Sequence, residues 1–240
     1  MKRHLLDAVL ETRAGGRTPV LATSLRSGNQ VLMLPLEGRS ASLVAGGDGL
    51  EVNDALHAAA LDAAERDASG VWEAPGGPVF LRVYAPPARL VVVGAVHVAQ
   101  PLAAMARAAG LAVVVVDPRE AFATEERFPG VRLLRSWPDE ALEVLAPDRR
   151  TAVVTLTHDP KLDDPGLSAA LRSPAFYVGA LGSRRTHARR LDRLRESGLG
   201  EDALRRIHGP VGLDVGARTP GEIAVSILAE VVATLRSARR

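Results

Sequence analysis

Cysteine is absent from the 240 residues of this chain. Its absence excludes a disulfide framework, a cysteine zinc site, an iron–sulfur cluster and a cysteine nucleophile. It also means that no side chain of the protein can carry a persulfide. Any transfer of sulfur through a thiol therefore requires a partner protein that supplies the thiol.

Long apolar runs and aromatic side chains are also scarce. No stretch approaches the ~20 consecutive apolar residues of a membrane-spanning helix. Asp7 and Glu11 interrupt the start of the chain before an apolar run of signal-peptide length. We therefore expect a cytoplasmic protein that does not bind a membrane. Aromatic residues make up 3% of the chain, and a short basic stretch without interleaved aromatics does not favour nucleic-acid binding.

The remaining composition is that of an ordinary globular protein. Hydrophobic residues make up 47% and charged residues 24%, which excludes disorder for most of the chain. The length suits one large domain or two small ones. Of the 30 basic residues only Lys2 and Lys161 are lysine. The positive charge is therefore almost all arginine, whose planar guanidinium binds phosphates and carboxylates through two parallel hydrogen bonds.

The first 85 residues predict a small α+β domain. Short apolar runs bounded by Gly, Pro or Ser predict strands, and they lie at residues 18–25, 30–35, 40–45 and 78–85. Apolar residues recur near helical spacing between the last two of these runs, which predicts a helix over residues 50–68. A first helix is expected over residues 2–12. We assign residues 1–85 to this N-terminal domain.

A linker follows at Pro86 and Pro87. Two adjacent prolines cannot donate backbone hydrogen bonds, and they stiffen an extended segment. The pattern of the chain also changes here from short strands to alternating strands and helices. We therefore place a linker at residues 86–88 and a second domain at residues 89–240.

The second domain predicts a doubly wound α/β fold. Continuous β-branched runs, as at residues 90–93 and 111–116, are typical of strands buried on both faces of a parallel sheet. Further strands are expected at residues 131–134, 152–157 and 175–178. Helices are expected between the strands, at residues 101–109, 139–145, 166–173, 184–196 and 201–207. A last helix begins at a capping box that Thr219, Pro220 and Glu222 form. This alternation predicts a Rossmann-like parallel sheet.

The turn after the first strand of this domain is a partial dinucleotide fingerprint. Gly94 occupies the first glycine position, and Ala99 is the small residue accepted at the last. Val96 replaces the glycine that lets a pyrophosphate approach the backbone. The turn by itself therefore favours a Rossmann fold that binds no nucleotide over one that binds a nicotinamide dinucleotide.

Three further residues lie at the same expected edge of the sheet. Asp117 and Arg119 follow the second strand, where an acidic residue would accept the ribose 2′-hydroxyl of a nucleotide. His97 lies just before the first helix, where the helix N-terminus disfavours a charged imidazole. We expect His97 to be a neutral hydrogen-bonding group for a ligand; the alternative is that it bonds only to nearby backbone.

A dense polar segment follows the fourth strand. His158, Asp159 and Lys161 lie in it together with Asp163 and Asp164. Polar loops after buried strands are common functional sites. The histidine and the three aspartates could bind a divalent metal. We favour the simpler interpretation that the aspartates cap the next helix.

The segment after the fifth strand predicts an anion-binding site. Gly182, Ser183, Arg184 and Arg185 come directly before a helix. Backbone N–H groups and the helix dipole would point at a bound anion, and the guanidinium groups would close over it. The alternative is an exposed basic helix, and we assign to a solvated face the later arginines: Arg189, Arg190, Arg193 and Arg195.

A glycine-rich run precedes the last helix. It contains His208, Gly209, Gly212 and Arg218. Glycines allow backbone to approach a ligand closely. A purely structural connection would not need this density of special residues, so we expect the run to contribute to a binding site.

Three of these segments resemble the signature segments of the XdhC/CoxI family. They are THDPKLD at residues 157–163, YVGALGSRRT at residues 177–186 and HGPVGLDVGARTP at residues 208–220. They occur in the family's order, and the resemblance extends over roughly residues 89–236. Members of this family are accessory factors of molybdenum hydroxylases such as xanthine dehydrogenase.

The resemblance implies a function that composition and spacing do not show. It implies a protein that binds molybdenum cofactor as cargo, supports its sulfuration by a partner cysteine desulfurase and helps to insert it into the apo molybdenum hydroxylase. It also implies a homodimer. The expected cofactor-binding residues are Gly94, His97, Asp117, Arg119, His158, Asp159, Lys161, Gly182, Ser183, Arg184, Arg185, His208, Gly209, Gly212 and Arg218.

The first domain resembles the family more weakly, through residues 21–23 and 46–51. Family members commonly have a Gly-Gly-Cys-hydrophobic-Glu segment here, and Gly49 stands where that cysteine would fall. We therefore expect a role in binding and delivery. Two alternatives stay open: an NAD(P)-dependent oxidoreductase, indicated by the Rossmann pattern, and an interaction module that binds no small molecule.

Overall fold

The computed structural model describes residues 2–35, 42–46 and 49–237, without the side chains of residues 42–44. Contacts within the chain divide it into two compact units, and the boundary between them along the sequence lies between Pro86 and Pro87. Each unit is described by itself.

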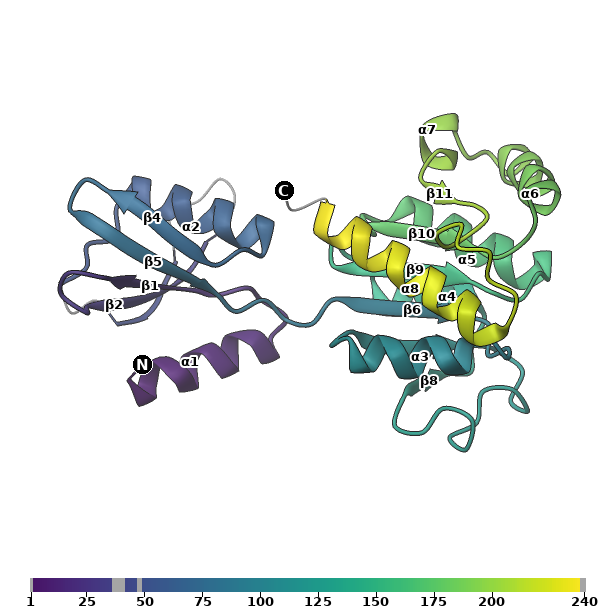
Figure 1. Ribbon diagram of the computed structural model, residues 1–240, viewed down its shortest axis with the longest axis horizontal. Coiled ribbons are helices and arrows are strands. Elements are labelled where there is room, and N and C mark those ends of the chain that lie inside the picture. The colour runs from purple at the N-terminus through teal and green to yellow at the C-terminus, as the bar shows by residue number, and fades with distance from the viewer. Residues whose placement is uncertain (1, 36–41, 47–48, 238–240) are drawn as a thin grey trace. The chain divides into compact units, whose positions relative to one another are not determined.

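The N-terminal unit is an antiparallel sheet with one helix on each face (Figure 1). The sheet order is β3-β2-β1-β5-β4. Its strands are β1 (Val20–Ser24), β2 (Gln30–Leu34), β3 (Ser42–Gly46), β4 (Gly70–Ala74) and β5 (Gly77–Val83). The helices are α1 (Arg3–Ala14) and α2 (Asp54–Arg66). Residues 40 and 41 of the predicted third strand lie outside the described residues.

Side-chain alternation along β1 explains why both faces are covered. Val20 and Ala22 point to one face, where they join the cluster that Leu56 of α2 closes. Leu21 points to the other face and packs with Leu5 of α1. A strand with apolar residues on both faces needs a cover on each side. Asn53 fixes the start of α2, because its side chain accepts a hydrogen bond from the Leu56 N–H at 2.9 Å.

The C-terminal unit is a six-stranded parallel sheet of order β11-β10-β9-β6-β7-β8. The strands are β6 (Arg89–Val93), β7 (Ala112–Val116), β8 (Arg132–Leu134), β9 (Thr151–Thr155), β10 (Tyr177–Ala180) and β11 (Ile207–His208). In chain order within the unit this is 6-5-4-1-2-3, the doubly wound arrangement of a Rossmann fold. The predicted fold class is confirmed. The strand order reverses between β6 and β9, which is where such sheets bind ligands.

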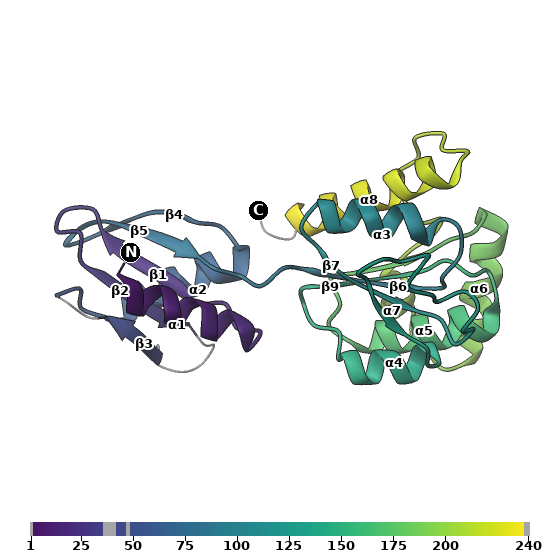
Figure 2. The ribbon, with the colours of Figure 1, turned by 90° about the horizontal axis from the view of Figure 1, so that it is seen from below.

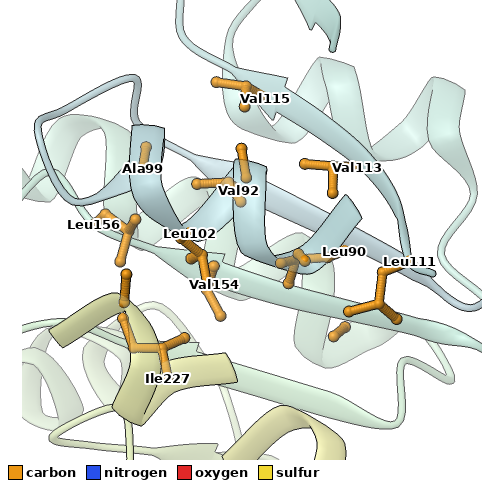
Figure 3. Close-up of a cluster of buried hydrophobic side chains, with 14 of the residues drawn as sticks. Leu90, Val92, Ala99, Leu102, Leu111, Val113, Val115, Val154, Leu156 and Ile227 are labelled. Carbon is orange, nitrogen blue, oxygen red and sulfur yellow. The ribbon is translucent and has the colours of Figure 1, made fainter. Parts of the chain in front are cut away.

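Helices cover both faces of this sheet (Figure 2). They are α3 (Ala99–Ala108), α4 (Pro138–Leu145), α5 (Pro160–Arg172), α6 (Arg184–Glu196), α7 (Glu201–Leu204) and α8 (Pro220–Ser237). Helices α3 and α8 lie side by side on one face, and α4 and α5 lie on the other. The buried apolar residues of this unit form two clusters. Figure 3 shows one of them, in which Leu90 and Val92 of β6 pack with Leu102 of α3 and Ile227 of α8.

The structure differs from the sequence prediction in three elements. Strand β4 was not predicted. Helix α5 begins at Pro160 rather than near residue 166, so the polar segment after β9 forms the first turns of a helix. The helix predicted over residues 201–207 stops at Leu204, and Ile207 pairs with β10 as a short strand. No helix of the described ranges is long and apolar enough to cross a membrane.

Candidate functional site

A buried aspartate stabilises the turn between β6 and α3 by a hydrogen bond to its backbone. Gly94 has a φ of +104°, a conformation that favours glycine, and a Cβ here would overlap Thr157. The next residue, Ala95, donates its N–H to Oδ2 of Asp117 at 2.8 Å. Asp117 is 0% exposed and comes directly after β7. The turn is therefore held by the strand next to it.

Arg119 donates three further hydrogen bonds to the carboxylate of Asp117. Its Nε and backbone N–H donate to Oδ1 at 2.8 and 3.0 Å, and its Nη2 donates to Oδ2 at 2.7 Å. Burial raises the pKa of Asp117, but the hydrogen bonds from Arg119 and Ala95 outweigh it and hold the pKa below its usual value. Each oxygen of Asp117 already accepts two hydrogen bonds, so this aspartate has no free acceptor for a ribose hydroxyl.

The other residues predicted around this turn are exposed or used in packing. His97 is exposed just before α3. Val96 is half-buried and packs on the apolar core of the unit. The guanidinium of Arg119 lies over the ring of Phe122, with 4.3 Å to the ring centroid. Val96 thus contributes to the core in the place where a dinucleotide site needs a glycine.

The turn after β9 is organised by a second buried aspartate. Asp163 accepts hydrogen bonds from Thr157 Oγ1 at 2.7 Å, from the Thr157 N–H at 3.3 Å and from the His158 N–H at 3.0 Å. Burial raises the pKa of Asp163 above its ordinary value in spite of these bonds. His158 has a left-handed φ of 63°, and a strained non-glycine residue of this kind is a recurrent feature of functional sites.

The other two aspartates of this segment, Asp159 and Asp164, form hydrogen bonds within the protein. Asp159 caps α5 by accepting a hydrogen bond from the Lys161 N–H at 3.0 Å. Asp164 binds Nε and Nη2 of Arg193 at 2.6 and 3.0 Å. Within the ranges that the structure describes, no group of three His, Asp or Glu side chains is arranged to hold a metal. The helix-capping interpretation of Asp159 is confirmed.

The turn after β10 leads into α6, as the sequence predicts. Ser183 caps this helix by accepting a hydrogen bond from the Thr186 N–H at 3.1 Å. Gly182 has a φ of +148°. The side chains of Arg184 and Arg185 are exposed, and in the described part of the chain neither forms a hydrogen bond or ion pair. Their charges are therefore available to a ligand.

The prediction that the later arginines of α6 form a solvated face is wrong for Arg190. Arg190 is 1% exposed and donates from Nη2 to the Leu181 carbonyl at 2.8 Å. Arg193 is bound to Asp164. Sequence spacing carries no signal for this difference, because the charged partners come from α5, more than 20 residues earlier in the chain.

The glycine-rich segment is held by a glutamate of α8. Glu230 accepts hydrogen bonds from the Tyr177 hydroxyl at 2.6 Å and from the Gly212 N–H at 2.7 Å, and it lies 2.9 Å from Nδ1 of His208. Burial raises the pKa of Glu230, but these bonds outweigh it and lower the pKa. The His208 and Tyr177 rings are stacked at a tilt, 4.4 Å apart. Glu230 therefore joins α8 to β10, β11 and the glycine-rich segment.

A cavity of about 390 Å³ lies where two of the predicted segments meet. The turn after β10 contributes Leu181, Gly182 and Arg184. The glycine-rich segment contributes residues 210–217, and α8 contributes Ile223 and Ser226. The volume is within the range of small-molecule sites in proteins. Backbone, apolar side chains, Arg184, Ser226 and the carboxylate-bearing Asp214 therefore surround a space that can hold a small ligand.

The predicted site residues fall into three groups. Gly182 and Arg184 join Gly212 around the cavity, and Ser183 and Arg185 lie beside it. The residues of the first βα turn and of the turn after β9 do not line it: Gly94, His97, Asp117, Arg119, His158, Asp159 and Lys161. His208 lies behind the segment on Glu230, Gly209 lies against the His187 ring, and Arg218 is exposed.

Comparison with known proteins places the chain in a family. The model of the XdhC Rossmann domain matches residues 90–231, which is more than half of the chain. This chain belongs to the XdhC family. The resemblance that the sequence motifs indicate is thus confirmed, and the matched region contains all three motif segments.

Two curated relatives are similar over part of this XdhC chain. A probable xanthine dehydrogenase subunit of Bacillus subtilis is 33% identical over 157 residues, 65% of this chain and 46% of that protein. The molybdenum cofactor insertion chaperone PaoD of Escherichia coli is 45% identical over 84 residues, 35% of this chain and 26% of PaoD. The matches thus span less than half the length of each relative.

A solved structure shares the fold of the whole chain. The crystal structure of a xanthine dehydrogenase from Bacillus halodurans superposes with a TM-score of 0.76 over 98% of this chain and 65% of that one, at 24% identity.

Residues 47 and 48 of the N-terminal segment that resembles the family lie outside the described residues. At Gly49, φ is +82° and a Cβ would lie 2.7 Å from Nδ2 of Asn29, so a cysteine at this position would require Asn29 to move.

Proposed function

We propose that this XdhC-family chain binds molybdenum cofactor and assists its insertion into an apo molybdenum hydroxylase. The cavity between the turn after β10 and the glycine-rich segment carries the proposal, because two of the family's motif segments form it. Molybdopterin joins a flat pterin to a phosphate. The apolar and glycine walls suit the ring system, and the start of α6 with Arg184 suits the phosphate.

The names of the relatives support the same role. One is a molybdenum cofactor insertion chaperone, and another is a probable xanthine dehydrogenase subunit. Because the chain has no cysteine, sulfuration of the cofactor would be carried out by a partner cysteine desulfurase. We propose that the chain delivers the cofactor as a cytoplasmic homodimer, and that its own side chains perform no sulfur chemistry.

The alternative of an NAD(P)-dependent oxidoreductase has little support in the geometry. Asp117 is buried, and Arg119 and Ala95 occupy its oxygens. Val96 is part of the apolar core. Both residues that a dinucleotide would require to be open are therefore used by the fold. The alternative of an interaction module that binds no small molecule is also less well supported, because it assigns no ligand to the cavity.

Titration of the purified protein with molybdenum cofactor, in parallel with NAD, tests the proposal. We expect micromolar binding of the cofactor, weakened by Arg184→Ala, and no response to NAD. Arg185→Ala is the matched control, because Arg185 is the exposed neighbour of Arg184 and does not line the cavity. Binding of NAD without cofactor would support the oxidoreductase, and silence from both ligands would support the interaction module.

Delivery requires a second measurement. The apo form of a molybdenum hydroxylase is mixed with cofactor in the presence and absence of this chain, and hydroxylase activity is followed in time. We expect faster activation with the wild-type chain than with Arg184→Ala. Equal activation with and without the chain would contradict a role in insertion.

A further inference from the structure

Arg190 lies directly beneath the turn that begins α6. Side chains on a helix point towards its N-terminus, and Nη2 of Arg190 reaches back to the Leu181 carbonyl at 2.8 Å. A Cβ placed on Gly182 would lie 3.7 Å from the same Nη2. Leu181 and Gly182 both line the cavity. The guanidinium therefore contacts the backbone of a turn that lines the cavity.

The positive charge of Arg190 is incompletely matched. Among the residues that the structure describes, its one ion-pair contact is Nη2 to Oδ2 of Asp163, at 3.5 Å, and Asp163 also accepts hydrogen bonds from Thr157 and His158. The neighbouring Asp164 is bound to Arg193. Nε and Nη1 of Arg190 are buried and have no partner among the described residues. Buried donors without acceptors cost free energy, and an anion nearby would lower that cost.

Further donors lie in the same turn. Ser183 satisfies the Thr186 N–H, but the N–H groups of Arg184 and Arg185 have no partner within the described part of the chain. Arg184 lines the cavity, and its guanidinium also has no partner among the described residues. Two free amides at a helix start, an exposed arginine and a buried arginine are therefore all part of this one turn or in contact with it.

We propose that Arg190, Arg184 and the first two amides of α6 form a subsite for the phosphate monoester of the cargo. This inference deepens the proposed function and rests on it for the identity of the ligand. A phosphate monoester is a tetrahedral dianion that accepts hydrogen bonds from several directions, which suits backbone amides and a guanidinium together. Arg184 binds the phosphate directly, and Arg190 is a positioning residue that holds the turn and supplies buried positive charge.

Titration of the ¹⁵N-labelled full chain with inorganic phosphate tests this subsite. We expect the amide resonances of Gly182, Arg184 and Arg185 and the side-chain Nε–H resonance of Arg190 to shift along one binding curve. Acetate at the same ionic strength should shift them far less. Shifts confined to other parts of the chain, or an Arg190 resonance that does not move, would overturn the proposal.

Two pairs of neighbouring arginines provide matched variants. Arg184→Gln and Arg190→Gln should each weaken phosphate binding by roughly tenfold, whereas Arg185→Gln and Arg189→Gln should change it less than about twofold. Equal effects within a pair would show that only net charge matters, which contradicts the subsite. If Arg190→Gln does not fold, the wild-type Arg190 resonance and the first pair of variants decide.

The two proposals fail in different ways. Phosphate binding without molybdenum cofactor binding supports the subsite and contradicts the proposed function. Cofactor binding that inorganic phosphate does not compete with, and that Arg184→Gln leaves unchanged, supports the function and contradicts the subsite.

Discussion

At the scale of single residues, two turns at the ends of the parallel strands depend on buried carboxylates. Asp117 and Asp163 each accept several hydrogen bonds from the turns after neighbouring strands. A carboxylate that accepts several N–H bonds fixes the backbone around it, because each lost bond would leave a buried donor without a partner. The exposed side chains on these loops therefore project from backbone that is already fixed in place.

Replacing Asp117 by asparagine should destabilise the C-terminal unit at neutral pH. The amide cannot accept all four hydrogen bonds, so we expect a loss of roughly 2–4 kcal/mol in the free energy of unfolding. Urea denaturation followed by circular dichroism measures it. Glu143→Gln, on the exposed surface of α4, is the control and should cost less than about 0.5 kcal/mol.

The same variant predicts a pH dependence. The pKa of Asp117 is lower in the folded protein than in the unfolded chain, so the carboxylate contributes stability above the unfolded value of about 3.9. That contribution is lost as the pH falls through the lower, folded pKa. The difference between wild type and Asp117→Asn should therefore be largest near neutral pH and shrink below about pH 4. A difference that stays constant down to pH 2 would show that the charge is not its cause.

Alanine substitutions at Gly94 and Gly110 distinguish the cost of steric overlap from the cost of backbone strain. Both have positive φ, +104° and +84°, but a Cβ at Gly94 would overlap Thr157, whereas nothing lies within 4 Å of one at Gly110. Gly110→Ala should cost about 1 kcal/mol from backbone strain alone, and Gly94→Ala at least about twice as much. Thermal unfolding of the two variants compares these costs. Equal losses would mean that Thr157 moves aside freely.

At the scale of elements, local signals made the C-terminal fold predictable. The capping box before α8 is confirmed, because Glu222 accepts from the Thr219 N–H at 2.9 Å and Thr219 Oγ1 accepts from the Glu222 N–H. The β-branched runs became central parallel strands. Helix α5 was mispredicted because Pro165, normally a helix breaker, lies inside it.

The site was less predictable than the fold. The two segments that form the cavity were both predicted from glycines and arginines near a helix start. The burial of Arg190 and the role of Glu230 depend on partners 27 and 18 residues or more away in the chain. Sequence spacing carries no signal for such contacts, because they depend on how α6 and α8 pack around the ends of the strands.

Glu230 should control the order of the glycine-rich segment. In Glu230→Gln the amide cannot accept all of the bonds from Tyr177, His208 and Gly212. We expect the Gly212 amide to exchange with solvent about tenfold faster, the factor that corresponds to ~1.4 kcal/mol. Hydrogen exchange measured by NMR reports it. Tyr177→Phe removes one donor and leaves the Gly212 bond, so its Gly212 protection should stay near wild type; equal loss in both variants would contradict this role.

At the scale of the whole molecule, the chain is two units with separate cores. The apolar clusters of the antiparallel sheet contain residues up to Ala85, and those of the parallel sheet begin at Ala88. No buried cluster in the described ranges includes residues from both units. The cavity and every residue assigned to the phosphate subsite belong to the C-terminal unit.

Residues 87–240 expressed alone should therefore fold and keep the phosphate response. The parallel sheet has helices on both faces and buries its own core, so removal of residues 1–86 leaves no large part of that core exposed. Circular dichroism should show one cooperative unfolding transition, and phosphate should shift the Gly182 and Arg184 resonances as in the full chain. A fragment that folds but has lost this response would show that the N-terminal unit contributes to the site. A fragment that does not fold would show that the two units depend on each other, against the predicted division into domains.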